Sequence, residues 1–289
     1  MTAKNETEKR TEKVISKDGT SLAYEKAGTG PALILVDGAL CHRGFGPMPK
    51  LRKELEKDFT VYTYDRRGRG ESSDTKPYSA EREVEDIAAL ITAAGGSVFV
   101  AGVSSGAALA LEAARSGLPI KKLALYEAPF IVDDTRTPTP PDFLEQLNAA
   151  LEKDHRGDAV RLFMKLVGMP AIMASLMRVF PVWKKLRAVA HTLPYDITIV
   201  KNFQQGKPLP RDRWMSIDIP TSVIVGGKSP KWMLNSMKQL AAVVPNAEHK
   251  TLPGQNHMVK AGVLAPALAE FFLGKREAVR ELSRAAAKA

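Results

Sequence analysis

The feature that most constrains this chain is a serine in a glycine-flanked turn between a strand and a helix. Residues 97–101 (SVFVA) are apolar after the first, as in a strand covered on both faces. They run directly into residues 102–106 (GVSSG), after which residues 107–116 show helical spacing. Small residues on either side of Ser104 allow the sharp, strained turn that this succession requires. The pattern predicts Ser104 projecting from the carboxyl end of a buried strand.

The rest of the chain alternates strands with helices. Strands are expected at residues 11–16 and 21–26, which form a hairpin, and at 32–36, 59–64, 97–101, 122–126, 221–225 and 248–252. Helices are expected at residues 49–57, 80–94, 107–116, 232–243 and 264–273. Such alternation predicts an α/β fold with a mostly parallel, eight-stranded sheet that helices cover on both faces.

The alternation stops between residues 133 and 213. Residues 135–141 are rich in proline and threonine, and only helical segments follow them, at residues 142–153, 158–167 and 170–190. The apolar residues of these helices recur at helical spacing, which suits either packing on the sheet domain or a lid over a cleft. We predict a core at residues 1–132 and 214–289, with a helical lid inserted at 133–213.

Composition and charge narrow the class of protein. The net charge is +10, but the 42 Lys and Arg are spread along the chain without a nucleic-acid-binding motif, so we expect no nucleic-acid partner. No run of 18 apolar residues exists, so we expect no membrane partner. The first 13 residues lack the apolar segment of a signal peptide, and the single cysteine, Cys41, excludes an internal disulfide. We expect a cytoplasmic protein of undetermined oligomeric state.

Three further segments make the chain resemble the α/β-hydrolase family. Residues 36–39 (VDGA) follow the strand at 32–36, where the family usually carries His-Gly. Residues 65–72 (DRRGRGES) match the family loop D-x-R-G-x-G-x-S, and residues 253–257 (PGQNH) end in the histidine that the family places after its last strand. The resemblance spans nearly everything from Val14 to Leu273. More narrowly, the chain resembles the small lidded hydrolases that are common in actinobacteria.

The resemblance implies acyl transfer to water on a small or medium ester, thioester or lactone. Ser104 would be the nucleophile and His257 the base, and the backbone N–H groups of Ala39 and Ser105 would form the oxyanion hole. A small-molecule substrate is implied, without a metal or an organic cofactor.

Four other histidines are candidates for the catalytic base if residue type alone is considered. His155 lies among charges at a helix end and His249 lies within a strand, so both are expected to be solvated or structural. His42 follows the oxyanion loop and His191 lies in the predicted lid, and both can line the substrate pocket. Met173 of the lid is a further candidate for the pocket.

The acid is where the sequence departs from the family's commonest pattern. The turn after the strand at 221–225 usually reads G-x-x-D, and here residues 226–229 read GGKS, with Ser229 in the acid position. The family has a second solution, seen in pancreatic-type lipases, with the acid one strand earlier. The resemblance then implies Glu127, with Asp133 or Asp134 as further candidates and a Ser–His dyad if none serves.

Asp37 is a second departure, since it replaces the family's histidine. A carboxylate beside an oxyanion hole opposes the developing negative charge unless it points away or is neutralised. Asp37 is expected to bond the loop backbone or to hold Arg43 or Arg66, and it is a candidate for the substrate site.

Two other functions remain compatible with these residues. Some relatives use the Ser–His pair as acid and base without a covalent intermediate, as in lyases and carbon–carbon bond hydrolases. A non-catalytic ligand receptor on the same scaffold is the third possibility, which the missing aspartate makes conceivable.

Overall fold

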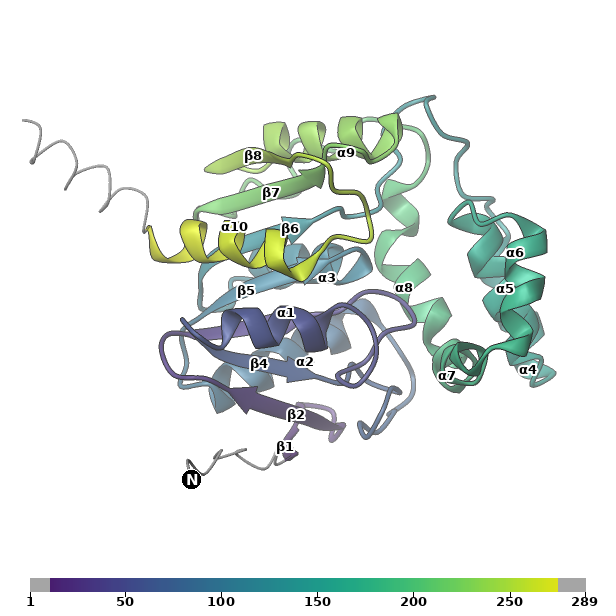
Figure 1. Cartoon of the computed structure of the whole chain (residues 1–289), viewed down its shortest axis with the longest axis horizontal. Coiled ribbons are helices and arrows are strands. Elements are labelled where there is room, and N and C mark those ends of the chain that lie inside the picture. The colour runs from purple at the N-terminus through teal and green to yellow at the C-terminus, as the bar shows by residue number, and fades with distance from the viewer. Residues whose placement is uncertain (1–10, 275–289) are drawn as a thin grey trace, which may run out of the picture.

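An eight-stranded sheet forms the centre of the molecule (Figure 1). The computed structural model describes residues 11–274, apart from the side chains of residues 171, 174 and 175. The strand order is β1-β2-β4-β3-β5-β6-β7-β8. The strands are β1 (Glu12–Ile15), β2 (Ser21–Ala27), β3 (Ala32–Val36), β4 (Thr60–Tyr64), β5 (Val98–Val103), β6 (Ile120–Tyr126), β7 (Thr221–Gly226) and β8 (Ala247–Leu252). β1 and β2 are antiparallel to their neighbours and β3 to β8 run parallel, which confirms the predicted fold class.

Helices cover both faces of this sheet (Figure 1). α1 (Met48–Leu55) and α10 (Ala261–Leu273) pack on one face. α2 (Ala80–Ala93), α3 (Ser105–Arg115) and α9 (Lys231–Val243) pack on the other. The central strands are therefore covered on both sides, and every residue of β5 and β7 is buried.

A helical insert connects β6 to β7. Its helices are α4 (Phe143–Glu152), α5 (Arg156–Leu166), α6 (Ala171–Leu176), α7 (Pro181–Val189) and α8 (Leu193–Val200), with 3₁₀ turns at Met177–Val179, Ala190–Thr192 and Lys201–Phe203. α4 to α7 stand beside the sheet domain (Figure 1). α4, α5, α7 and α8 share a separate small core that includes Leu147, Trp183 and Leu186. α8 packs against α3 and so joins the insert to the sheet domain.

The predicted continuous helix at residues 170–190 is wrong. α6 ends at Leu176, Phe180 is extended (φ −98°, ψ 150°), and Pro181 starts α7. Proline lacks an N–H and suits the first turn of a helix, so it starts a new helix instead of continuing the previous one. The sequence analysis also missed α8, whose residues LPYDITIV combine proline with β-branched side chains.

Residues 1–10 and 275–289, which the sequence analysis assigns to the core, lie outside the described residues. Within residues 11–274, no helix combines the length and the apolar character needed to cross a membrane.

Candidate active site

The predicted site residues lie at the carboxyl ends of adjacent parallel strands. The loop with Asp37 follows β3, Ser104 follows β5 and Glu127 follows β6. Ser229 lies after β7, and His257 lies in the loop after β8. Because these strands are parallel neighbours, their carboxyl ends meet at one edge, where open α/β sheets bind their ligands.

Ser104 occupies a strained turn between β5 and α3. Its φ of 57° and ψ of −130° are rare for a residue with a side chain, and such backbone strain costs on the order of 1–3 kcal/mol. A Cβ on Gly102 would lie 2.4 Å from the carbonyl oxygen of Gly106, and one on Gly106 would lie 2.3 Å from that of Val36. Both glycines are therefore required by close backbone contacts. The Ser104 side chain remains partly exposed.

Glu127 and His257 form a hydrogen bond at this edge. Glu127 Oε2 lies 2.8 Å from His257 Nδ1, within the separation predicted for an acid–histidine pair. Glu127 Oε1 accepts hydrogen bonds from Gly226 N–H at 2.8 Å and from the Ser229 hydroxyl at 2.5 Å. The carboxylate is fully buried, so all of its acceptor capacity is directed by these three groups.

The charge of Glu127 follows from the same contacts. Burial opposes ionisation, but hydrogen bonds with His257, Ser229 and Gly226 outweigh it, so the pKa of Glu127 lies below its ordinary value. Glu127 is therefore an anion at neutral pH. Its φ of 49° shows that the chain turns sharply at this residue, directly after β6.

The loop that carries His257 is held from two sides. The Tyr126 hydroxyl donates to the carbonyl of Asn256 at 2.6 Å, and Lys228 N–H donates to that of Gln255 at 2.7 Å. These bonds fix the loop against β6 and β7, while the His257 side chain stays 44% exposed. The ring is thus oriented by Glu127 on one side and open on the other.

The remaining histidines have other surroundings. His42 Nδ1 accepts from Gly44 N–H at 3.2 Å within its own loop, and burial lowers the pKa of this histidine. Burial also lowers the pKa of His191, whose ring faces the backbone of Gly68. His155 faces Asp158 at 3.6 Å and His249 lies exposed on β8. Among the described residues, the ring that bonds Glu127 is that of His257.

Asp37 bonds its own loop, as expected for aspartate before glycine. Its Oδ1 accepts from Gly38 N–H at 3.0 Å, whereas Arg66 binds the Asp37 backbone carbonyl at 3.2 Å. Arg43 pairs with Asp65 instead, at 3.1 Å. Burial raises the pKa of Asp37 to about 7, against the lowering effects of Arg69, Gly38 N–H and Arg66. Asp37 therefore carries only a partial negative charge near neutral pH.

The two expected oxyanion donors lie next to Ser104. Ser105 is the residue after it and starts α3. A Cβ on Gly38 would lie 3.0 Å from Ser104 Cβ, so the loop that carries Ala39 passes directly against the serine. Within residues 11–274, the N–H groups of Ala39 and Ser105 donate to no protein acceptor. Both groups are thus free to bind an oxygen atom of a substrate.

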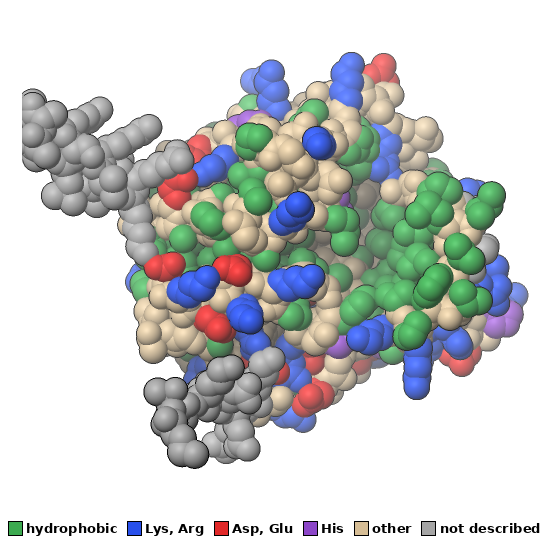
Figure 2. Space-filling view, in the orientation of Figure 1, with side chains coloured by type: hydrophobic (Ala, Val, Ile, Leu, Met, Phe, Trp, Pro, Cys, Tyr) green, Lys and Arg blue, Asp and Glu red, His purple; other side chains and the backbone are tan. Residues whose placement is uncertain are grey.

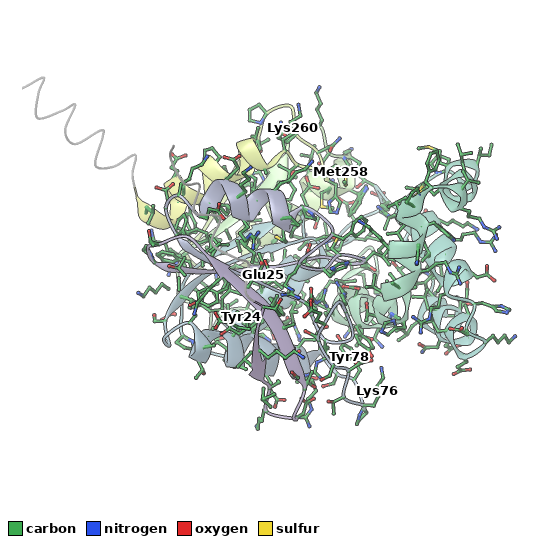
Figure 3. The ribbon with its side chains drawn as sticks, turned by 60° about the horizontal axis from the view of Figure 1, so that its bottom comes forward. Tyr24, Glu25, Lys76, Tyr78, Met258 and Lys260 are labelled. Atoms are coloured by element: carbon green, nitrogen blue, oxygen red, sulfur yellow. The ribbon has the colours of Figure 1, made fainter. Side chains whose placement is uncertain are left out.

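Large apolar side chains are exposed on the insert. Figure 2 shows hydrophobic side chains gathered over α5 and α6, with the surface hollowed between them and the sheet domain. Figure 3 shows Met258, the residue after His257, on the side of the sheet domain that faces the insert. Side chains that are more than half exposed on α6, the following turn and this loop are Ile172, Met173, Leu176, Val179, Phe180 and Met258.

Sequence analysis missed a cluster of buried charges behind the site. Arg66 and Arg69 both bind Asp196 of α8, and Ser105 bonds the same carboxylate. Arg66 and Arg69, on either side of Arg67 and Gly68 in the loop DRRGRG, indicated such a cluster, because buried guanidinium groups need acidic partners. Asp196 gave no local signal. Among the described residues, no group of three or more His, Cys, Asp or Glu side chains is arranged to hold a metal ion.

The parallel sheet, the serine turn and the histidine loop at its carboxyl edge define the architecture of an α/β hydrolase. The chain belongs to the alpha/beta hydrolase family, whose sequence model matches residues 35–267. It is similar to the crystal structure of an alpha/beta hydrolase from Sphaerobacter thermophilus DSM 20745, with 48% identity over 90% of this chain and 100% of that chain and a TM-score of 0.83.

More distant structures share the fold alone. An esterase from Thermogutta terrifontis is 23% identical over 95% of this chain and 98% of that chain, with a TM-score of 0.60. An enol-lactonase from Burkholderia xenovorans LB400 is 21% identical over 91% of this chain and 100% of that chain, with a TM-score of 0.65.

Proposed function

We propose that this chain is a serine hydrolase that cleaves a small or medium carboxylic ester, thioester or lactone through an acyl-enzyme. The observation that carries the proposal is the 2.8 Å hydrogen bond between the buried Glu127 carboxylate and His257 Nδ1, at the same sheet edge as Ser104. A buried anion on Nδ1 holds the proton there and leaves Nε2 free to accept one. His257 is then a base directed at its exposed side.

In the proposed mechanism, Ser104 Oγ attacks the substrate carbonyl while His257 Nε2 takes the serine proton. Glu127 stabilises the imidazolium that forms, and the N–H groups of Ala39 and Ser105 bind the developing oxyanion. His257 gives the proton to the leaving alcohol, which leaves the acyl group on Ser104. Water then attacks the acyl-enzyme and gives its proton to His257. As the acyl–Oγ bond breaks, His257 returns that proton to Ser104 Oγ, and the acid product departs.

The proposed substrate has an apolar portion, and residues 133–213 act as its lid. Exposed apolar side chains, including that of Met173, lie on α6. Figure 2 shows hydrophobic side chains of the insert beside the hollow next to the sheet domain, and such a surface suits a flexible acyl or alcohol chain. An esterase and an enol-lactonase are among the proteins that share this fold, which agrees with an ester or lactone substrate.

The test measures hydrolysis of p-nitrophenyl esters from acetate to octanoate, together with covalent labelling by a fluorophosphonate. Ser104→Ala is expected to abolish both, because the alcohol that forms the acyl-enzyme is gone. Ser116→Ala is the matched control, since Ser116 lies exposed at the other end of α3 and its hydroxyl bonds only the carbonyl of Ala113. Its activity should equal that of the wild type.

The outcomes separate the three candidate functions. Wild-type labelling and ester turnover that both vanish in Ser104→Ala support the hydrolase. A wild type that resists fluorophosphonate indicates an inert serine, as in a ligand receptor. Labelling without trapping of any acyl-enzyme from a slow ester favours acid–base chemistry of the lyase kind.

A further inference from the structure

A buried cluster of ionised side chains lies directly behind the loop that follows β3. Arg66 and Arg69 come from the loop after β4, Glu83 from α2 and Asp196 from α8, and each side chain is at most 2% exposed. Asp196 lies 2.7 Å from Arg66 Nη1 and 2.7 Å from Arg69 Nη2. Burial opposes ionisation of Asp196, but Arg69, Arg66 and Ser105 lower its pKa below the ordinary value. The carboxylate is therefore an anion held between two cations.

Arg69 also binds the backbone of the loop after β3. Its Nη1 donates to the carbonyl oxygen of Gly38 at 2.6 Å and to that of Cys41 at 3.1 Å. A peptide group is planar and trans, so the N–H of Ala39 points opposite to the carbonyl of Gly38. Holding that carbonyl on Arg69 therefore fixes the Ala39 N–H in the opposite direction, away from the guanidinium.

The second proposed oxyanion donor is attached to the same cluster. The Ser105 hydroxyl donates to Asp196 Oδ1 at 2.7 Å. Asp196 thus binds Ser105, the first residue of α3, through Oδ1. Its Oδ2 binds Arg69, which orients the N–H of Ala39. The Arg69 Nε group is held in turn by the Thr192 hydroxyl at 3.0 Å, so the guanidinium has partners on each side.

We infer that Arg69 and Asp196 are positioning residues that align the two N–H donors of the oxyanion hole. This inference rests on the proposed function. Neither side chain touches the substrate: Arg69 acts through the Gly38 carbonyl, and Asp196 acts through Arg69 and Ser105. The helical insert therefore contributes to the chemistry of the site as well as to its cover, because α8 supplies the carboxylate.

Arg67 provides a matched control within the same loop. It is fully buried, and its guanidinium binds Asp86 at 2.7 Å and Asp18 at 2.8 Å. Its remaining contact is with the carbonyl of Arg82, in α2. Arg67 is therefore as buried as Arg69 and binds two carboxylates, whereas Arg69 binds one. Of the two, only Arg69 contacts the loop after β3.

The experiment compares Arg69→Lys with Arg67→Lys on the best p-nitrophenyl ester and on a trifluoromethyl ketone. The ketone carbon bonds Ser104 Oγ, the serine proton passes to His257, and the ketone oxygen becomes an anion like that of the transition state. Lysine keeps the charge but lacks the fork that reaches Gly38 and Asp196 together. Arg69→Lys should lower kcat about 10- to 100-fold and weaken ketone binding by a similar factor, with little change in KM.

Arg67→Lys separates this effect from a general loss of stability. It should lower Tm at least as much as Arg69→Lys, since it removes a buried bidentate pair with Asp86 and an ion pair with Asp18. It should nevertheless leave kcat and ketone affinity within about threefold of the wild type. An Arg69→Lys variant that binds the ketone as tightly as the wild type would overturn the inference. If the wild type shows neither ester turnover nor fluorophosphonate labelling, the proposed function is wrong, and so is the inference that rests on it.

Ser105→Ala decides the question if Arg69→Lys does not fold. This change removes the hydroxyl that bonds Asp196 and keeps the backbone N–H, and alanine suits the first turn of a helix. It should lower kcat and ketone affinity about fivefold, as expected for one lost buried hydrogen bond. A change in both that stays below about twofold would also overturn the inference.

Discussion

Replacement of Glu127 by glutamine tests the proposed acid most directly. In the wild type, Oε1 accepts from Gly226 N–H at 2.8 Å, and Oε2 lies 2.8 Å from His257 Nδ1. A glutamine has one oxygen for these two positions. If its oxygen stays on Gly226, its NH₂ group faces His257. The imidazole must then accept at Nδ1 and carry its proton on Nε2, which is the tautomer that cannot take the serine proton.

The opposite orientation of the amide is disfavoured by the backbone. With the glutamine oxygen on His257, the NH₂ group would face the N–H of Gly226, and two buried donors would oppose each other at a cost of about 1–3 kcal/mol. The hydroxyl of Ser229 can donate to an oxygen or accept from an NH₂ group at this position, so it does not decide between the two orientations. The fixed donor of Gly226 therefore selects the inactive tautomer.

The expected loss in kcat is about 10³- to 10⁴-fold, which corresponds to about 4–5.5 kcal/mol of transition-state stabilisation. Steady-state hydrolysis of the best p-nitrophenyl ester measures it, with Tm as a check on folding. Ser229→Ala is the control: it removes one donor to Glu127, at about 0.5–1.5 kcal/mol, and leaves the histidine contact, so kcat should fall by less than about tenfold. A Glu127→Gln variant within tenfold of the wild type would refute this reasoning.

Three further outcomes are expected. Ser104→Ala, His257→Ala and the double variant should lose about the same activity in the ester assay, because the two side chains act as one unit; additive losses contradict this. Met173→Ala should shift the preferred acyl length and spare acetate ester turnover, since Met173 is exposed on α6; equal losses on all esters point to packing. For Asp37, burial raises the pKa to about 7 from an ordinary 3.8, so the folded state retains a proton that the unfolded chain loses, and stability falls as pH rises from about 4 to 7. Asp37→Asn should remove that dependence, which amounts to about 3 kcal/mol between pH 5 and pH 8, in urea unfolding at these two pH values; parallel pH curves for variant and wild type would contradict it.

Local patterns in the sequence were sufficient for the sheet and the serine turn. Buried parallel strands such as β3 must be apolar at every position, and the Ser104 turn must have glycine where the backbone passes within 2.4 Å. Both requirements are met by residues next to one another in the chain. The break before Pro181 was missed because the apolar spacing continues across it, although proline itself signals a helix start.

Contacts between distant residues explain what could not be predicted. Asp196 meets Arg69 across 127 positions and Arg66 across 130, and nothing around α8 in the sequence indicates either pair. The same holds for the raised pKa of Asp37, which follows from burial, although its hydrogen bond with Gly38 N–H was expected from the sequence. Glu127 could be proposed as the acid only because the family resemblance offers two strands as its source.

The two positions that can supply the acid, residues 127 and 229, lie too close together for both to carry a carboxylate. The Ser229 hydroxyl, in the family's commonest acid position, lies 2.5 Å from Glu127 Oε1. An aspartate there would bring two buried carboxylates into contact, and such a pair cannot ionise fully, so the pKa of one of them must rise. Ser229→Asp should therefore lose stability as pH increases, because the folded state alone holds the extra proton.

Removing Glu127 at the same time should relieve this conflict. In the Glu127→Ala/Ser229→Asp variant, the new carboxylate has no acidic neighbour at residue 127 and lies on the same side of the His257 ring. It should restore about 10- to 100-fold of the kcat that Glu127→Ala alone loses, since an anion again fixes the imidazole tautomer. Thermal unfolding at pH 5 and pH 8 should show a pH-dependent loss in Ser229→Asp and none in the double variant. The prediction is contradicted if the double variant is no more active than Glu127→Ala and both aspartate variants show the same pH dependence. That result would mean that a carboxylate at residue 229 does not contact the histidine and that repulsion between the two carboxylates does not decide which position supplies the acid.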